Sequence, residues 1–124
     1  VIPEIVIMEA ERHLQRRFPE FHIDFEMFLA LVDCERVPLP TPEEVRAAST
    51  LMRQAEDIPV ALSVIAARVD YFVTLDKDFT DQHPSTQRVR DLMPSIMLPA
   101  VFLREIMSWS SEQLEAVRHR TWSD

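Results

Sequence analysis

Apolar residues recur three and four positions apart over residues 2–18 and again over residues 20–32. This spacing places the apolar side chains on one face of a helix. Pro19 separates the two segments, so the pattern predicts two helices packed as a hairpin. Val37 and Leu39 then alternate with prolines, which allows a short strand or an extended connector at most.

The middle of the chain carries two helix-start signals and then a strand signal. The run 41–44 (TPEE) combines a hydroxyl cap, a proline at the first helical position and acids in the first turn, and it predicts a helix to about Gln54. The run 57–59 (DIP) repeats this arrangement before a nearly unbroken apolar segment, which predicts a buried helix. Residues 71–75 (YFVTL) favour β structure and predict a buried parallel strand that ends at Asp76.

The last third predicts a polar loop after Asp76, a small strand over 96–98, a helix from Pro99 to about Met107, and a capped terminal helix from Ser110 to about Arg118. Helices alternating with short strands indicate the α/β class. We expect residues 1–124 to form one domain with a short, mostly parallel sheet flanked by helices.

Composition excludes several kinds of site. The chain of 124 residues has no glycine, so Walker-type phosphate loops, dinucleotide-binding turns and glycine-flanked serine nucleophiles are excluded. Its single cysteine, Cys34, excludes an internal disulfide and a multi-cysteine zinc site. With 13 basic and 21 acidic residues the formal net charge is −8, which argues against broad electrostatic capture of nucleic acid. No apolar stretch approaches membrane-spanning length, so we expect no membrane contact, and the single cysteine fits a reducing, cytoplasmic setting.

Four acids stand where their surroundings make them candidates for a metal site. Glu9 lies beside apolar residues in the first helix, Asp57 begins the buried helix, Asp76 ends the strand, and Asp78 follows two positions later. Carboxylates that converge repel one another unless a cation lies between them, and oxygen ligands favour Mg²⁺ or Mn²⁺. Other roles stay open at this point: Asp57 also fits a helix cap alone, Asp76 and Asp78 fit ordinary turn acids, and Glu9 fits a solvated helix position.

Two stretches resemble the second half of PIN-domain ribonucleases, a family that includes the toxins of many prokaryotic toxin–antitoxin pairs. They are the Asp57 helix (57–67, DIPVALSVIAA) and the strand with its Thr-x-Asp-x-Asp-Phe turn (71–79, YFVTLDKDF). The run 96–103 (IMLPAVFL) is similar to the last strand and final helix of that family, and Met8-Glu9 is similar to its mid-chain acidic helix, with Glu11 as the competing acid. The resemblance covers nearly the whole chain.

The resemblance implies a PIN-like fold in which Glu9, Asp57 and Asp76 are catalytic and hold Mg²⁺ or Mn²⁺, assisted by Asp78. The family begins with a strand that ends in a further metal-binding Asp, and the eight residues before Glu9 contain neither. We therefore expect the physiological chain to extend upstream, or a partner chain to fill the gap. We also expect these 124 residues to be inactive on RNA until that strand is supplied.

The function that this resemblance implies is metal-dependent endoribonuclease activity, with RNA as substrate and the toxin role of a toxin–antitoxin pair. An antitoxin protein and further copies of the chain are then candidate partners. The alternative is a PIN-like module without catalysis that serves in protein interaction or regulation.

Overall fold

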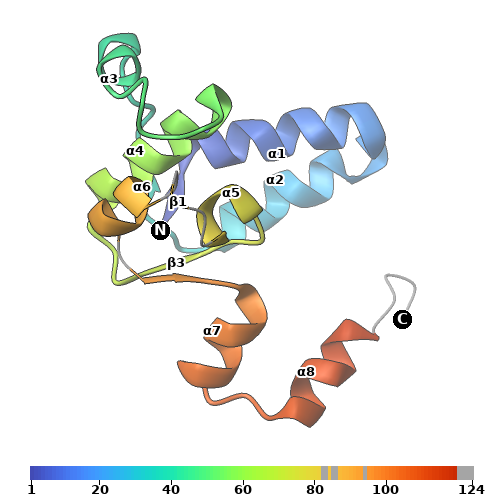
Figure 1. Cartoon of the computed structure of the whole chain (residues 1–124). Coiled ribbons are helices and arrows are strands. Elements are labelled where there is room, and N and C mark those ends of the chain that lie inside the picture. The colour runs from blue at the N-terminus through green and yellow to red at the C-terminus, as the bar shows by residue number, and fades with distance from the viewer. Residues whose placement is uncertain (82–83, 85–86, 94, 120–124) are drawn as a thin grey trace.

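The computed structural model describes residues 1–81, 84, 87–93 and 95–119. Helices make up most of it, with four short strands (Figure 1). In chain order the elements are β1 (Ile2–Pro3), α1 (Glu4–Arg17), the 3₁₀ turn η1 (Pro19–Phe21), α2 (His22–Leu31), β2 (Arg36–Val37), α3 (Pro42–Ala47), the 3₁₀ turn η2 (Ala55–Asp57), α4 (Ile58–Ala67), β3 (Tyr71–Val73), α5 (Lys77–Thr80), α6 (Gln87–Leu92), β4 (Ser95–Met97), α7 (Pro99–Glu105) and α8 (Ser111–Arg118).

The expected mixed α/β class and the parallel strand pairing are confirmed, but the described strands form two separate two-stranded sheets. In one, β1 pairs with β2, and Ile2 lies opposite Arg36. In the other, β3 pairs with β4, and Phe72 lies opposite Ile96. Parallel pairs require a crossover connection, and helices supply it in both sheets.

The hydrophobic core is built around α4, which contacts both α1 and α3 (Figure 1). The expected burial of this helix is confirmed, since Ala61 is fully buried and Ile58 is 2 % exposed. The rings of Phe72 in β3 and Phe79 in α5 meet edge to face with centroids 5.1 Å apart. This contact ties the sheet to the segment that carries the candidate acids.

The predicted helical hairpin is confirmed as α1 and α2, which lie side by side. The start of the first helix was wrong, because Ile2 and Pro3 precede α1 as strand β1 and pair with β2. The predicted helix caps at Thr41 and Ser110 are also confirmed, each as a reciprocal capping box. Thr41 Oγ1 accepts from the Glu44 backbone N–H at 3.1 Å, and the Thr41 N–H donates to Glu44 Oε1 at 3.2 Å. The helix that begins at Thr41 is shorter than expected, because α3 ends at Ala47.

Residues 48–54 form turns and bends in place of the expected continuation of that helix. Ser49 and Thr50 have weak helix propensity, and the next two residues, Leu51 and Met52, are only 5 % and 6 % exposed. Burial of these two side chains in the core outweighs the extra turns of an exposed helix.

The prediction of a polar loop after Asp76 was also wrong in part, because the short helices α5 and α6 form in this segment. Each helix places one apolar residue in the core: Phe79 of α5 is 1 % exposed and Val89 of α6 is fully buried, whereas Leu92 of α6 is exposed. Strand β3 is less buried than expected, since Tyr71 and Val73 are exposed and Phe72 alone points into the protein. In the described part of the chain, no helix is long and apolar enough to cross a membrane.

Candidate metal centre

Three carboxylates come together where β3 leads into α5. One oxygen from each of Asp57, Asp76 and Asp78 lies within 4.8 Å of the other two. Asp57 ends η2 immediately before α4, Asp76 follows β3, and Asp78 lies in the first turn of α5. The core contact between β3 and α5 and the packing around α4 bring these distant segments to one place.

Asp76 is held by local hydrogen bonds of the turn. Its backbone N–H donates to Thr74 Oγ1 at 3.1 Å, and its Oδ1 accepts from the Asp78 backbone N–H at 2.9 Å. The second bond caps α5. The expectation of a turn acid is therefore correct for Asp76, and this same bond fixes the orientation of its carboxylate, which is exposed to solvent.

Asp78 has a basic neighbour that the sequence pattern did not reveal. Arg53 Nη2 lies 3.5 Å from Asp78 Oδ1, and the two side chains are 45 % and 28 % exposed. The residues are 25 positions apart, and Arg53 stands in the irregular segment between α3 and η2. No periodic pattern or short motif could have indicated this pair.

Asp57 does not act as a helix cap. It occupies the cap position of α4, but its side chain makes no capping hydrogen bond, which contradicts the interpretation of this residue as a cap alone. Its Oδ2 is buried and has no hydrogen-bond partner in the described residues. Asp57 is thus available for a role other than capping the start of α4.

The pKa of Asp57 is raised from 3.8 to about 7. Burial of the carboxyl is the largest cause, followed by a hydrogen bond with the Asp78 side chain and by the negative charges of Asp76, Asp78 and Glu56. Two ionised carboxylates this close repel each other, so a proton on one of the two groups relieves the contact between Asp57 and Asp78. Near neutral pH, therefore, either one of these carboxyl groups carries a proton or the ionised carboxylates repel one another.

Glu9 lies on α1 as an exposed residue, and Glu11 is half-buried on the same helix. Neither belongs to the group of converging carboxylates that the described residues form. Of the four acids that the sequence indicated, the structure brings together Asp57, Asp76 and Asp78.

Comparison of the chain with protein-family models, with characterised proteins and with solved structures found no match. The resemblance to PIN-domain ribonucleases therefore depends on the sequence motifs, and the description of the site depends on its own geometry.

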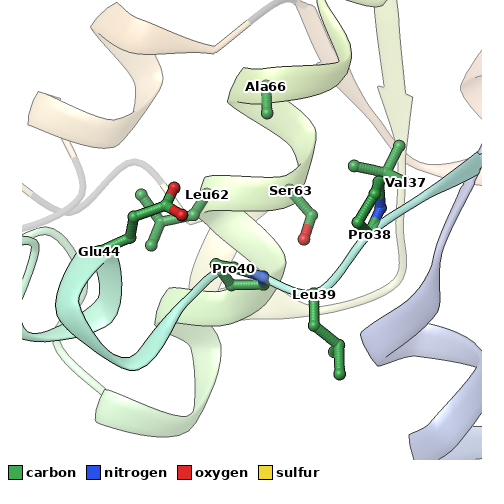
Figure 2. Close-up of a pocket in the computed structure, with 8 residues that line it drawn as sticks. All are labelled: Val37, Pro38, Leu39, Pro40, Glu44, Leu62, Ser63 and Ala66. Carbon is green, nitrogen blue, oxygen red and sulfur yellow. The ribbon is translucent and has the colours of Figure 1, made fainter.

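A pocket of about 210 Å³ lies between α4 and the segment that follows β2, away from the carboxylates. Figure 2 shows Leu62, Ser63 and Ala66 of α4 on one side and residues 37–40 on the other. Its polar groups already have partners, because Ser63 Oγ donates to the Pro59 carbonyl at 2.8 Å and Glu44 takes part in the capping box of α3. This pocket lacks the chemistry of a catalytic site.

Proposed function

We propose that the chain is a metal-dependent endoribonuclease that hydrolyses RNA phosphodiester bonds, with Asp57, Asp76 and Asp78 as the residues that hold Mg²⁺ or Mn²⁺. The observation that carries the proposal is the convergence of these three carboxylates, from two segments about 20 residues apart, within 4.8 Å. The motif resemblance supports the choice of RNA and the toxin role, in which an antitoxin protein would be the partner in the cytoplasm.

The residues present fit a divalent cation. All three ligands are oxygens, which favour Mg²⁺ or Mn²⁺ over softer metals. Asp57 Oδ2 is buried without a hydrogen-bond donor, and the pKa of its carboxyl is about 7, chiefly because burial disfavours the ionised form and further because of the hydrogen bond with Asp78 and the neighbouring negative charges. A bound cation would relieve this repulsion and satisfy that oxygen.

When bound, such a cation polarises a phosphodiester and lowers the pKa of a coordinated water. The chain itself supplies orientation and charge. The Asp78 backbone N–H donates to the Asp76 carboxylate at 2.9 Å and orients it, and the Arg53 guanidinium beside Asp78 would bind a phosphate oxygen of an RNA substrate. Among the described residues neither Asp57 nor Asp76 forms a salt bridge, so no basic side chain competes with a cation for these two carboxyl groups.

The proposal is tested by RNA cleavage in millimolar Mn²⁺ together with a direct measurement of Mn²⁺ binding. Because the resembled family has an additional strand that ends in Asp, cleavage is measured with and without a peptide of that kind. We expect Mn²⁺ to bind, RNA to be cleaved in at least one of the two conditions, and Asp76→Asn to abolish both. Asp70→Asn, an exposed acid outside the cluster, is the matched control and leaves both unchanged.

Two outcomes would contradict the proposal in different ways. Absence of Mn²⁺ binding by the folded wild-type chain would remove the metal site. Mn²⁺ binding without cleavage in either condition would retain the site and favour the alternative, a non-catalytic interaction or regulatory module.

A further inference from the structure

Helix α2 exposes an apolar stripe on the side that faces away from α1. Phe25 and Leu29 are half-buried on its inner face. On the outer face Ile23, Met27 and Leu31 follow one another at intervals of four residues and are 67 %, 58 % and 82 % exposed. Figure 1 shows α1 and α2 as a hairpin that extends from the rest of the molecule, so this face is open to a partner.

The stripe is unusual for a surface helix. A helix that packs on one side normally presents polar residues on the other, and a helix that is apolar all round is normally buried. Contiguous exposed apolar side chains of this kind mark interaction sites. Covering them would gain the transfer energy of three large side chains that the free chain leaves in water.

The acidic side chains of α2 itself, Asp24 and Glu26, have no basic Lys or Arg beside them on that helix. Between residues 18 and 35 the sequence has five acids and no lysine or arginine: Glu20, Asp24, Glu26, Asp33 and Glu35. At about 100° of rotation per residue, Asp24 and Glu26 fall on opposite sides of the stripe. Glu26 also lies 3.1 Å from the His22 ring. The apolar stripe therefore has acidic borders.

We propose that the outer face of α2 binds a cationic amphipathic helix of a partner protein, with the apolar side of that helix on the stripe and its Lys or Arg residues beside Asp24 and Glu26. Apolar anchors at intervals of four residues match the spacing of a docked helix. Charge complementarity favours this partner over a second copy, because a chain with a net charge of −8 would bring one acid-only segment against another. The inference does not depend on the proposed nuclease activity.

The probe is a fluorescent 16-residue peptide of Leu and Lys with leucines at helical spacing, and its binding is measured by anisotropy. A second peptide of the same composition has its leucines rearranged so that no apolar face forms. We expect the amphipathic peptide to bind about tenfold more tightly than the rearranged one and to weaken as salt is raised. The control for charge is a Leu and Glu peptide with the same spacing, which should not bind.

Protein variants locate the site. The double variant Met27→Ser, Leu31→Ser is expected to weaken binding about tenfold without lowering the melting temperature, because both side chains are exposed in the free protein. Asp24→Lys with Glu26→Lys is expected to weaken binding and to reduce its salt dependence. Val117→Ser, which changes an exposed apolar residue of α8, is the matched control and should bind as the wild type does.

Equal binding of the two Leu and Lys peptides, no binding of either, or full binding by the Met27→Ser, Leu31→Ser variant would overturn the inference. Sedimentation provides a further test. A dimer of the wild-type chain that this double variant abolishes would assign the stripe to a second copy instead.

Discussion

The guanidinium of Arg53 lies 3.5 Å from Oδ1 of Asp78 and joins the irregular segment after α3 to the first turn of α5. One of the three converging carboxylates therefore already has a positive neighbour, whereas Asp57 has a buried oxygen without a donor. Arginine and a divalent cation would compete for the Asp78 carboxylate. This competition gives the proposed site a property that can be measured.

Replacing Arg53 by Gln should strengthen Mn²⁺ binding. The substitution removes a positive charge beside a proposed ligand, and since both side chains are partly exposed we expect a gain of about two- to fivefold in affinity. Titration calorimetry of both proteins measures it. Arg46→Gln is the matched control, because Arg46 forms a similar 3.4 Å pair with Glu43 on exposed α3. Weaker Mn²⁺ binding by Arg53→Gln would mean that Arg53 chiefly positions Asp78.

The raised pKa of Asp57 predicts how stability depends on pH. The folded state holds the proton up to a pKa of about 7, whereas the unfolded chain releases it near 3.8. The folded state therefore binds more protons between these values, so this group lowers the free energy of unfolding as pH rises from about 4 to about 7, with no further change above. The raised pKa of Asp57 therefore lowers the free energy of unfolding at pH 8, and this effect disappears as the pH falls toward 4.

Asp57→Asn should remove that contribution. At pH 8 we expect the variant to be more stable than the wild type by about 1–2 kcal/mol after allowance for screening by solvent, and the difference should shrink toward pH 4.5. No capping bond is lost, because Asp57 makes none. Urea unfolding without metal at both pH values checks this result, with Asp70→Asn as control. An equal difference at the two pH values would show that the effect is not the titration of Asp57.

Two substitutions of Asp76 should distinguish its structural role as the cap of α5 from its proposed role as a metal ligand. In Asp76→Asn the amide oxygen can still accept the Asp78 N–H, so the apo protein should melt no lower than the wild type. Asp76→Ala loses that cap and should be less stable by about 1 kcal/mol. Both variants should lose the rise in melting temperature that Mn²⁺ gives the wild type. A rise that persists in Asp76→Asn would remove this residue from the site.

The elements that sequence predicted well are governed by local chemistry. The caps at Thr41 and Ser110 need only neighbouring residues, and the hairpin of α1 and α2 follows from apolar spacing interrupted by Pro19. The end of α3 was missed because burial of Leu51 and Met52 is a tertiary effect that outweighs local propensity. Helix α5 was missed because it contains a single apolar residue, Phe79, and one residue cannot produce a periodic pattern.

In the candidate site too, the local features could be predicted from sequence and the tertiary contacts could not. The Thr-x-Asp turn at Asp76 is local and its hydrogen bonds could be anticipated, while the proximity of Asp57 to Asp78 depends on how α4 packs against the β3–α5 connection. The Arg53–Asp78 pair depends on that packing too. Glu9 fitted both a site residue and a solvated helix position in the sequence, and the structure confirms the second, because its side chain is exposed on α1.

Arg68 should be replaceable by glycine with a gain in stability. It ends α4 in the left-handed conformation, with φ 52° and ψ 43°, and its N–H donates to the Ile65 carbonyl at 3.4 Å. This conformation costs a residue with a Cβ about 1–2 kcal/mol, whereas glycine adopts it without that cost. The greater freedom of glycine in the unfolded chain offsets part of the gain.

We therefore expect Arg68→Gly to raise the free energy of unfolding by about 0.5–1 kcal/mol, measured by urea unfolding. Ala66→Gly provides the matched control two residues earlier. It introduces the same residue at an exposed position inside α4 and should lower stability by about 1 kcal/mol. Because both variants add one glycine to the unfolded chain, the difference between them isolates the conformation at residue 68. Equal destabilisation by the two substitutions would contradict a left-handed end of α4.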